Sequence, residues 1–298
     1  MFNKKITGHI LALLTVIVWG GTFISSKALL EGGFSAVEIL VMRFLIGYIT
    51  LWILLPMRLP YQGIRRELLM AAAGLTGMTI YYLAENIAVD YASPALVSIL
   101  VCTAPFFCGI FAGIIMKEKL TKGFFTGFVI AIAGVAMVSL EGSSEGVNLG
   151  LLGSVLSMLA AVMWGIYLVI MQRVNSGGGN VIIITRRVFF YGLIFMIPAI
   201  FLGDFNLDIK AMFSGIMLWH MLFLGVVASA LCFFTWNKIL KVIGTMKASA
   251  YIYLVPLITM ILSKIIRPND KITIVTLIGS ILILTGLVLS EYDGKRMQ

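Results

Sequence analysis

Apolar runs of about 20 residues follow one another along nearly the whole chain, separated by short polar stretches. A helix needs about 20 apolar residues to cross a bilayer, so each run is long enough to form one span. Lipid offers no partner to unpaired backbone groups, and the alternating pattern of barrel strands is absent, so helices are predicted. We expect an all-α membrane protein with ten transmembrane helices, at 8–30, 34–56, 68–90, 94–116, 123–140, 150–172, 181–202, 215–239, 247–266 and 272–290.

A polar stretch from Glu141 to Asn148 divides these runs into two groups of five. It is rich in Gly and Ser and contains no Lys or Arg, as expected for a connection outside the membrane. The predicted organisation is a first five-helix repeat at 1–141, an extracellular or periplasmic linker at 142–149 and a second five-helix repeat at 150–298.

The two halves share short motifs in the same order, which is the expected trace of a duplication in a transporter. The matched segments are Val18-Trp19-Gly20 with Met163-Trp164-Gly165, Met42-Arg43-Phe44 with Arg186-Arg187-Val188, Asn86 with Asn237, Pro105 with Pro256, and Gly127 and Gly134 with Gly279 and Gly286. Each half has an odd number of spans, so we expect the two five-helix repeats to be inverted in the membrane. Inverted copies can exchange conformations around a site near the midplane, which is typical of transporters and which an enzyme does not need.

These segments resemble those of a known family. The residues that carry the resemblance are the Trp-Gly of the first span, Arg43-Phe44, Asn86 with Pro94 and Pro105, Lys117-Glu118-Lys119-Leu120, and Gly127 with Gly134. The chain is similar over essentially its whole length to the EamA family of the drug/metabolite transporter superfamily. The resemblance implies ten helices in two inverted repeats and, commonly, export of amino acids or related metabolites. The chain departs from the family pattern at Arg267-Pro268-Asn269-Asp270, where an acidic residue before Leu is usual.

Composition and charge agree with a membrane protein and indicate its orientation. Only 12% of residues are charged and the mean hydropathy is +1.06, whereas soluble domains carry roughly 25% charged residues. The 22 Lys and Arg are scattered at the ends of spans, so the net charge of +9 does not indicate nucleic-acid binding. Most of these loop charges fall on one side, which predicts that both termini are cytoplasmic in the membrane of a prokaryotic cell. The exceptions on the other side are Lys27, Lys210, Lys264, Arg267 and Lys271.

Glu85 is the first candidate for a functional residue, because an ionisable group within a span costs about 2.5–3.5 kcal/mol to insert and usually faces a cavity or a partner. Tyr81 lies one turn before it on the same helical face, and Asn86 is adjacent. One interpretation is that Glu85 binds a substrate amine or carries a proton during exchange. The alternative is that it reaches interfacial water or pairs structurally with an Arg.

Arg43 and Arg187 also lie within predicted spans and could hold a carboxylate, because a guanidinium stays charged and offers a bidentate fork. Their matched places in the two halves favour a structural role at helix ends or at a gate.

Aromatic, amide and proline positions complete the candidates. Trp19, Trp164 and Trp236 offer ring faces for an apolar solute, although packing explains any single ring as well. Asn86 and Asn237 suit either ligand contact or hydrogen bonds between helices. Pro105 and Pro256 remove a backbone hydrogen bond within a span, which makes them candidate hinges or static kinks.

The sequence favours a transporter over an enzyme. Gly142-Ser143-Ser144-Glu145-Gly146 matches the GxSxG pattern, but it lacks the strand-turn-helix setting that this nucleophile motif requires. Phosphate-binding and dinucleotide motifs are absent, and the three cysteines show no metal spacing, so no cofactor or metal is expected. We predict a secondary transporter of small metabolites, exporting amino acids or related solutes by alternating access. A permease for drugs or other amphipathic solutes is the main alternative, and a lipid-modifying enzyme or a channel is a more distant one. Protons are a candidate coupling ion, and the substrate and oligomeric state stay open.

Overall fold

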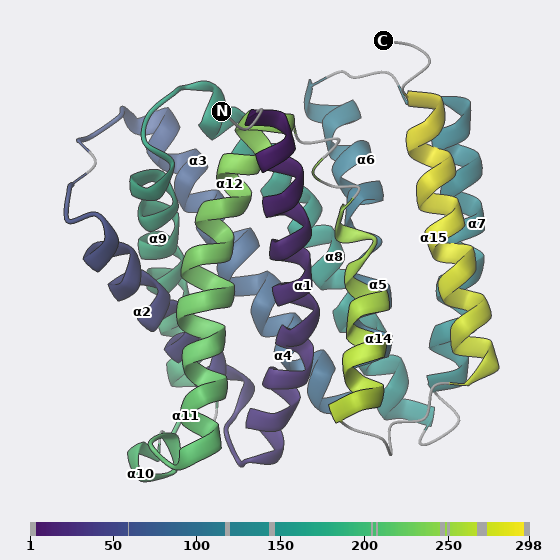
Figure 1. Ribbon diagram of the computed structural model, residues 1–298, viewed down its shortest axis with the longest axis horizontal. Coiled ribbons are helices and arrows are strands. Elements are labelled where there is room, and N and C mark those ends of the chain that lie inside the picture. Colours follow the sequence, from purple (N-terminus) through teal and green to yellow (C-terminus); the bar gives the residue numbers. More distant parts are fainter. Residues whose placement is uncertain are drawn as a thin grey trace.

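The computed structural model describes residues 4–58, 60–116, 120–142, 147–203, 205–206, 208–244, 248, 251–266 and 273–294, and in these ranges every regular element is a helix (Figure 1). The α-helices of the first half are α1 (Lys4–Glu31), α2 (Ala36–Leu54), α3 (Ile64–Gly74), α4 (Tyr81–Tyr91), α5 (Pro94–Val101), α6 (Ala104–Met116) and α7 (Lys122–Gly142), with the π-helical segment η1 (Leu75–Ile80) joining α3 to α4. Those of the second half are α8 (Val147–Ser176), α9 (Val181–Leu202), α10 (Ile209–Met212), α11 (Gly215–Leu222), α12 (Cys232–Ile243), α14 (Val255–Ile266) and α15 (Ile274–Gly294), with the π-helical segment η3 (Phe223–Leu231) joining α11 to α12.

Seven helical stretches in the described part of the chain are long and apolar enough to cross a membrane. They are Ile6–Glu31, Ala36–Leu54, Ile64–Tyr91, Pro94–Ile115, Gly150–Ser176, Val181–Leu202 and Gly215–Ile243. Three shorter apolar helices occur where the fifth, ninth and tenth spans are predicted, at Lys122–Met137, Val255–Ile266 and Ile274–Gly286. The prediction of an all-helical, multi-pass membrane protein is therefore confirmed.

Local capping signals set several helix starts. The Ser35 side chain accepts a hydrogen bond from the Glu38 backbone N–H, and the Glu38 carboxylate accepts one from the Ser35 backbone N–H, so α2 begins with a capping box. The Ser93 side chain accepts a hydrogen bond from the Leu96 N–H and so caps α5, with Pro94 in the first turn, where the missing N–H costs nothing. Asn180 caps α9. Polar residues thus fix where each apolar segment enters its helix.

Two predicted spans are interrupted. The span at 94–116 breaks at Cys102–Thr103, between α5 and α6, and a similar turn at Tyr253–Leu254 precedes α14. A proline clashes with the carbonyl four residues before it, and Pro105 and Pro256 stand four residues after the last helical residue of the preceding segment. We had expected both prolines to lie in the middle of a continuous helix. Instead, each lies in the first turn of a new helix.

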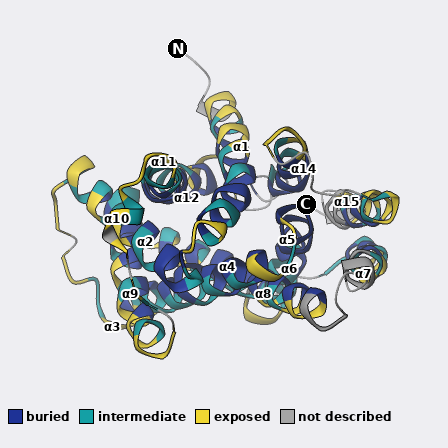
Figure 2. Cartoon of the chain, turned by 90° about the horizontal axis from the view of Figure 1, so that it is seen from below, coloured by how far each residue is buried: buried dark blue, intermediate teal, exposed yellow. Residues whose placement is uncertain are grey.

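Helices α7 and α15 pack mainly on each other and form one end of the molecule, opposite α2, α3 and α9 (Figure 2). Their contact depends on small residues: a Cβ at Gly134 would lie 2.5 Å from the Gly279 carbonyl oxygen, and one at Gly286 would clash with the Gly127 carbonyl. Such close backbone approach is typical of membrane helix pairs, where packing replaces the hydrophobic effect.

The outer surface is apolar, and the centre holds the buried polar groups. Exposed faces carry large apolar side chains such as Ile53 and Leu202, as expected for surfaces in contact with lipid tails (Figure 2). Glu85, Arg43 and Asn86 are fully or almost fully buried. Predicted linker residues 143–146 and the departing segment 267–270 lie outside the described residues.

Candidate functional site

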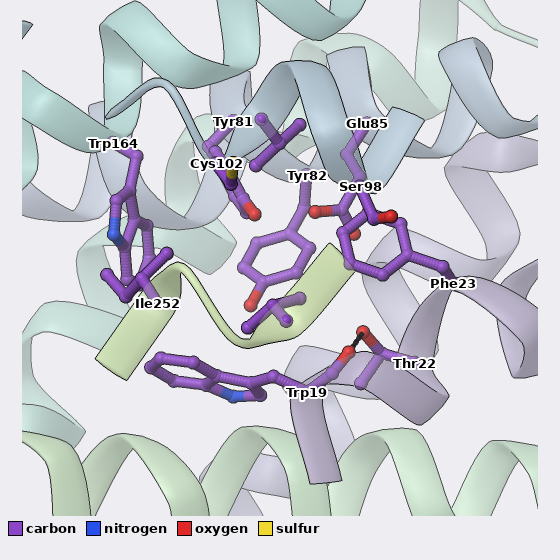
Figure 3. A pocket seen from close by; sticks show the side chains of 12 residues that line it. Trp19, Thr22, Phe23, Tyr81, Tyr82, Glu85, Ser98, Cys102, Trp164 and Ile252 are labelled. Atoms are coloured by element: carbon purple, nitrogen blue, oxygen red, sulfur yellow. Dashed lines mark hydrogen bonds between the residues drawn. The ribbon is translucent and has the colours of Figure 1, made fainter. Parts of the chain in front are cut away.

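A small cavity lies among α1, α4, α5, α8 and the start of α14 (Figure 3). Its lining combines aromatic rings from α1, α4 and α8 with polar groups from α1, α4 and α5. The free volume is about 40 Å³, enough for two or three water molecules at roughly 10–15 Å³ each. The cavity is therefore far too small for a metabolite in the conformation described.

Glu85 is the one acidic residue among the described residues that line the cavity, and only 1% of its surface is exposed. Figure 3 shows its carboxyl group pointing into the cavity between Tyr82 and Phe23. The Tyr81 hydroxyl lies within hydrogen-bonding reach of the carboxyl, and Glu85 Oε1 has no partner among the described residues. In the conformation described, the carboxyl group therefore faces the cavity and not the protein surface. A buried acceptor without a partner costs free energy that a bound cation, amine or proton would recover.

Arg43 supplies a buried positive charge next to this site. Its Nε donates to Ser229 Oγ at 3.3 Å, and its guanidinium lies 4.1 Å from the centre of the Tyr82 ring, which also lines the cavity. The two terminal nitrogens of Arg43 have no hydrogen-bond partner in the part of the chain that is described. Arg43 and Glu85 are thus opposite charges held close to the same cavity without a direct ion pair.

The tryptophan candidates form one aromatic cluster, but only two of them reach the cavity. The rings of Trp19 and Trp164 meet edge to face with centroids 5.7 Å apart, an arrangement that favours aromatic pairs. Trp19 also donates to the Ala228 carbonyl at 3.2 Å. Trp236 packs against Trp19 at 4.8 Å and is completely buried outside the lining.

The two asparagines tie helices together. Asn86 Nδ2 donates to the Ala36 carbonyl at 3.2 Å, joining α4 to α2. Asn237 Nδ2 donates to Thr185 Oγ1 at 2.9 Å, joining α12 to α9. Neither residue lines the cavity, so their observed contacts are those of interhelical hydrogen bonding.

Arg187 lies away from the cavity. Its Nε is 3.9 Å from Glu67 Oε2, an oxygen that also accepts a hydrogen bond from the Tyr191 hydroxyl at 2.6 Å. The Arg43 carbonyl lies next to Gly225, and the Val188 carbonyl lies next to Gly74.

The structure adds cavity residues that were not singled out from the sequence. Thr22 and Phe23 contribute from α1, and Ser98 and Cys102 from α5 and its break. Among the residues that the structure describes, no three His, Cys, Asp or Glu side chains gather into a metal site.

Comparison with known proteins identifies related sequences and a related fold. An uncharacterized transporter of Archaeoglobus fulgidus is 25% identical over 95% of this chain and 96% of its own, and one of Clostridium kluyveri is 26% identical over 97% and 94%. A probable terminal-alkyne amino-acid exporter of Streptantibioticus cattleyicolor is 22% identical over 84% of this chain and 82% of its own. A solved crystal structure shares the fold, with a TM-score of 0.70 over 98% of both chains at 15% identity.

The same family pattern occurs twice in the sequence. It matches residues 6–140 and again residues 151–292, one match on each side of the polar stretch in the middle of the chain. Together the two matches cover nearly the whole protein. The chain therefore belongs to the EamA-like transporter family.

Proposed function

We propose that this protein is a secondary transporter that exports amino acids or related solutes across a prokaryotic cell membrane by alternating access. The observation that carries the proposal is the small cavity, in which the Glu85 carboxyl is surrounded by aromatic rings. Its walls come from both family-matched halves, with α1, α4 and α5 from the first and α8 and α14 from the second. A site between two repeats is where a transporter of this design binds its solute.

We further propose ten spans in two inverted repeats, 1–141 and 150–298, joined outside the membrane and with both termini in the cytoplasm. Contacts that recur with the halves exchanged support this arrangement. Gly134 of α7 packs on Gly279 of α15, and Gly286 of α15 packs on Gly127 of α7. Likewise, Gly20 of α1 packs against Ile258 of α14, and Gly165 of α8 packs against Phe107 of α6, between equivalent helices.

The size of the cavity supports a mechanism in which helices separate. Sites for small molecules typically enclose about 300–1,000 Å³, whereas this cavity measures about 40 Å³. The conformation described thus leaves too little room for a metabolite at the site. The breaks at Cys102–Thr103 and Tyr253–Leu254 lie beside the cavity, and the adjacent Pro105 and Pro256 are the proposed hinges.

Glu85 is the proposed point of contact for a solute amine or a coupling proton. A substrate amine placed beside it would satisfy the unpaired Oε1, and the aromatic rings would cover an apolar side chain. The probable amino-acid exporter among the relatives supports the same substrate class. A permease for amphipathic cations is the second candidate, favoured by a lining with one carboxyl group and several aromatic faces.

Flux into proteoliposomes tests the proposal. Labelled amino acids and amphipathic cations are offered at several pH values to the wild type and to Glu85→Gln. We expect saturable flux of one class, and we expect Glu85→Gln to reduce the flux and remove its dependence on pH, because an amide neither titrates nor attracts an amine.

Glu67→Gln is the matched control, since Glu67 is also a buried acid but lies outside the cavity. It should keep the pH dependence of the wild type. Unchanged flux of Glu85→Gln at every pH would show that Glu85 does not couple transport to protons. Ion conductance that does not saturate would show that the protein is a channel and not a transporter.

A further inference from the structure

A second and larger cavity is lined by residues of α2, of the segment that follows it and of α9. These helices lie at the end of the molecule opposite α7 and α15 (Figure 2). It measures about 360 Å³ and shares no lining residue with the central cavity. Its walls combine cations and aromatic rings: Arg58, Arg186, Arg187, Tyr48, Trp52 and Phe190. We call this space the flank cleft.

One arginine in the lining of the flank cleft, Arg186, is buried and holds the neighbouring segments together. Arg186 is only 3% exposed, and its guanidinium stacks 3.6 Å above the Trp52 ring. It also donates hydrogen bonds to the carbonyl oxygens of Leu55 and Met57 in the segment that follows α2. These bonds hold the segment that follows α2 against α9, and Arg58 of that segment lines the cleft.

The remaining charges leave the flank cleft positive. Arg58 is exposed and has no hydrogen-bond or ion-pair partner among the described residues. Glu67 lies outside the lining and interacts with Arg187 and Tyr191. Among the described residues, the lining contains three guanidinium groups and no carboxylate, so an anion entering the cleft meets positive charge.

An apolar stripe continues from the flank cleft along the lipid-facing side of α9. Phe190, Ile194, Ile197 and Phe201 are all exposed, and their spacing places them on one face of the helix. At 1.5 Å per residue the stripe is about 16 Å long, which is about half of the 30 Å hydrocarbon core. That length fits one acyl chain in one leaflet.

We propose that the flank cleft binds an acidic phospholipid, with Arg58 and Arg187 at the phosphate and an acyl chain along the α9 stripe. The cations lie near the start of α9 and the apolar stripe runs from there toward its end, so the headgroup and the acyl chain of one lipid can contact both. Basic clefts between membrane helices are suited to such headgroups, and each exposed cation near an anionic lipid surface contributes about 1 kcal/mol. On the orientation proposed above, the lipid belongs to the cytoplasmic leaflet.

Lipid retention by the full-length protein tests this site. Protein purified in detergent is incubated with phosphatidylglycerol or phosphatidylcholine, and bound lipids are counted by native mass spectrometry. Wild type should retain phosphatidylglycerol in preference to phosphatidylcholine. In Arg58→Gln that preference should fall about fivefold, the loss expected for one cation near an anionic lipid.

Arg65→Gln is the matched control, because Arg65 is exposed, carries the same charge and does not line the cleft. The preference is a ratio within each variant, so a general loss of stability affects both lipids alike. Equal preferences in the two variants would overturn the proposal. Displacement of phosphatidylglycerol by an equal concentration of its deacylated headgroup would also overturn it, because the cleft would then bind a free anion. Retention needs no transport, so the result is independent of the proposed function.

Discussion

Arg43 and Glu85 are two opposite charges that the protein keeps in its interior without an ion pair. They lie on α2 and α4, and the Tyr82 ring contacts Arg43 on one side and lines the cavity on the other. Burying a charge costs free energy that only partners recover, and each of these groups has atoms without one. Their mutual attraction is therefore expected to be part of what stabilises the site.

A double-mutant cycle measures that attraction. Arg43→Met should lower the melting temperature of the purified protein, since it leaves the Glu85 carboxyl without an opposing charge. The loss should be smaller in a Glu85→Gln background, with a coupling of about 0.5–3 kcal/mol, as found for interacting neighbours. Additive losses of stability would show that the two charges do not interact.

The sequence indicated part of the site at this scale. An acid within an apolar run is conspicuous because of its insertion cost, so Glu85 and its helical neighbour Tyr81 were found. Thr22 and Ser98 were not, because hydroxyl groups in such runs usually bond to a preceding carbonyl. Both do so here, to Trp19 and Ala95 respectively, while also facing the cavity.

At the scale of elements, apolar length predicted where the helices lie, and local chemistry decided how they are divided. The prolines at 105 and 256 were visible in the sequence, and in each case the preceding helix ends four residues before the proline. The π-helical segments η1 and η3 were not predicted, because one extra residue in a turn leaves an almost uniformly apolar run unchanged in composition. The two segments occupy similar places, one directly before α4 and the other directly before α12.

The α7–α15 pair yields a prediction about packing. Gly134→Leu should destabilise the protein by about 1–3 kcal/mol, because a side chain there meets the backbone of α15. The melting temperature in detergent measures the effect. Ala133→Leu is the control, since Ala133 directly precedes Gly134 and is exposed. Equal losses in both variants would show that α15 does not approach α7 this closely.

At the scale of the whole molecule, the family match makes the chain a transporter and not an enzyme. Charge bias and an even span number predicted that both ends lie on one side of the membrane. Helix α1 begins and α15 ends on the same face of the molecule in Figure 1, which agrees with that prediction. The loop charges predict that this side is the cytoplasmic one.

Reporter fusions test the orientation. A fluorescent protein that matures only in the cytoplasm should be bright at either terminus. The same reporter inserted at Asp208, an exposed position between α9 and α10, should be dark because that loop is predicted to lie outside. The reverse pattern would invert the topology, and one bright and one dark terminus would mean an odd number of spans.

The two halves of the chain contribute unequally to the cavity, and this affects where substitutions can alter the transported solute. On the proposed pairing of the repeats, Glu85 of α4 corresponds to Trp236 of α12. The polar lining residues Thr22, Glu85 and Ser98 come from the first half, whereas the second half contributes Trp164, Ile252 and Val255. Selection for a new cargo should therefore enrich substitutions in α1, α4 and α5, while the second copy changes little.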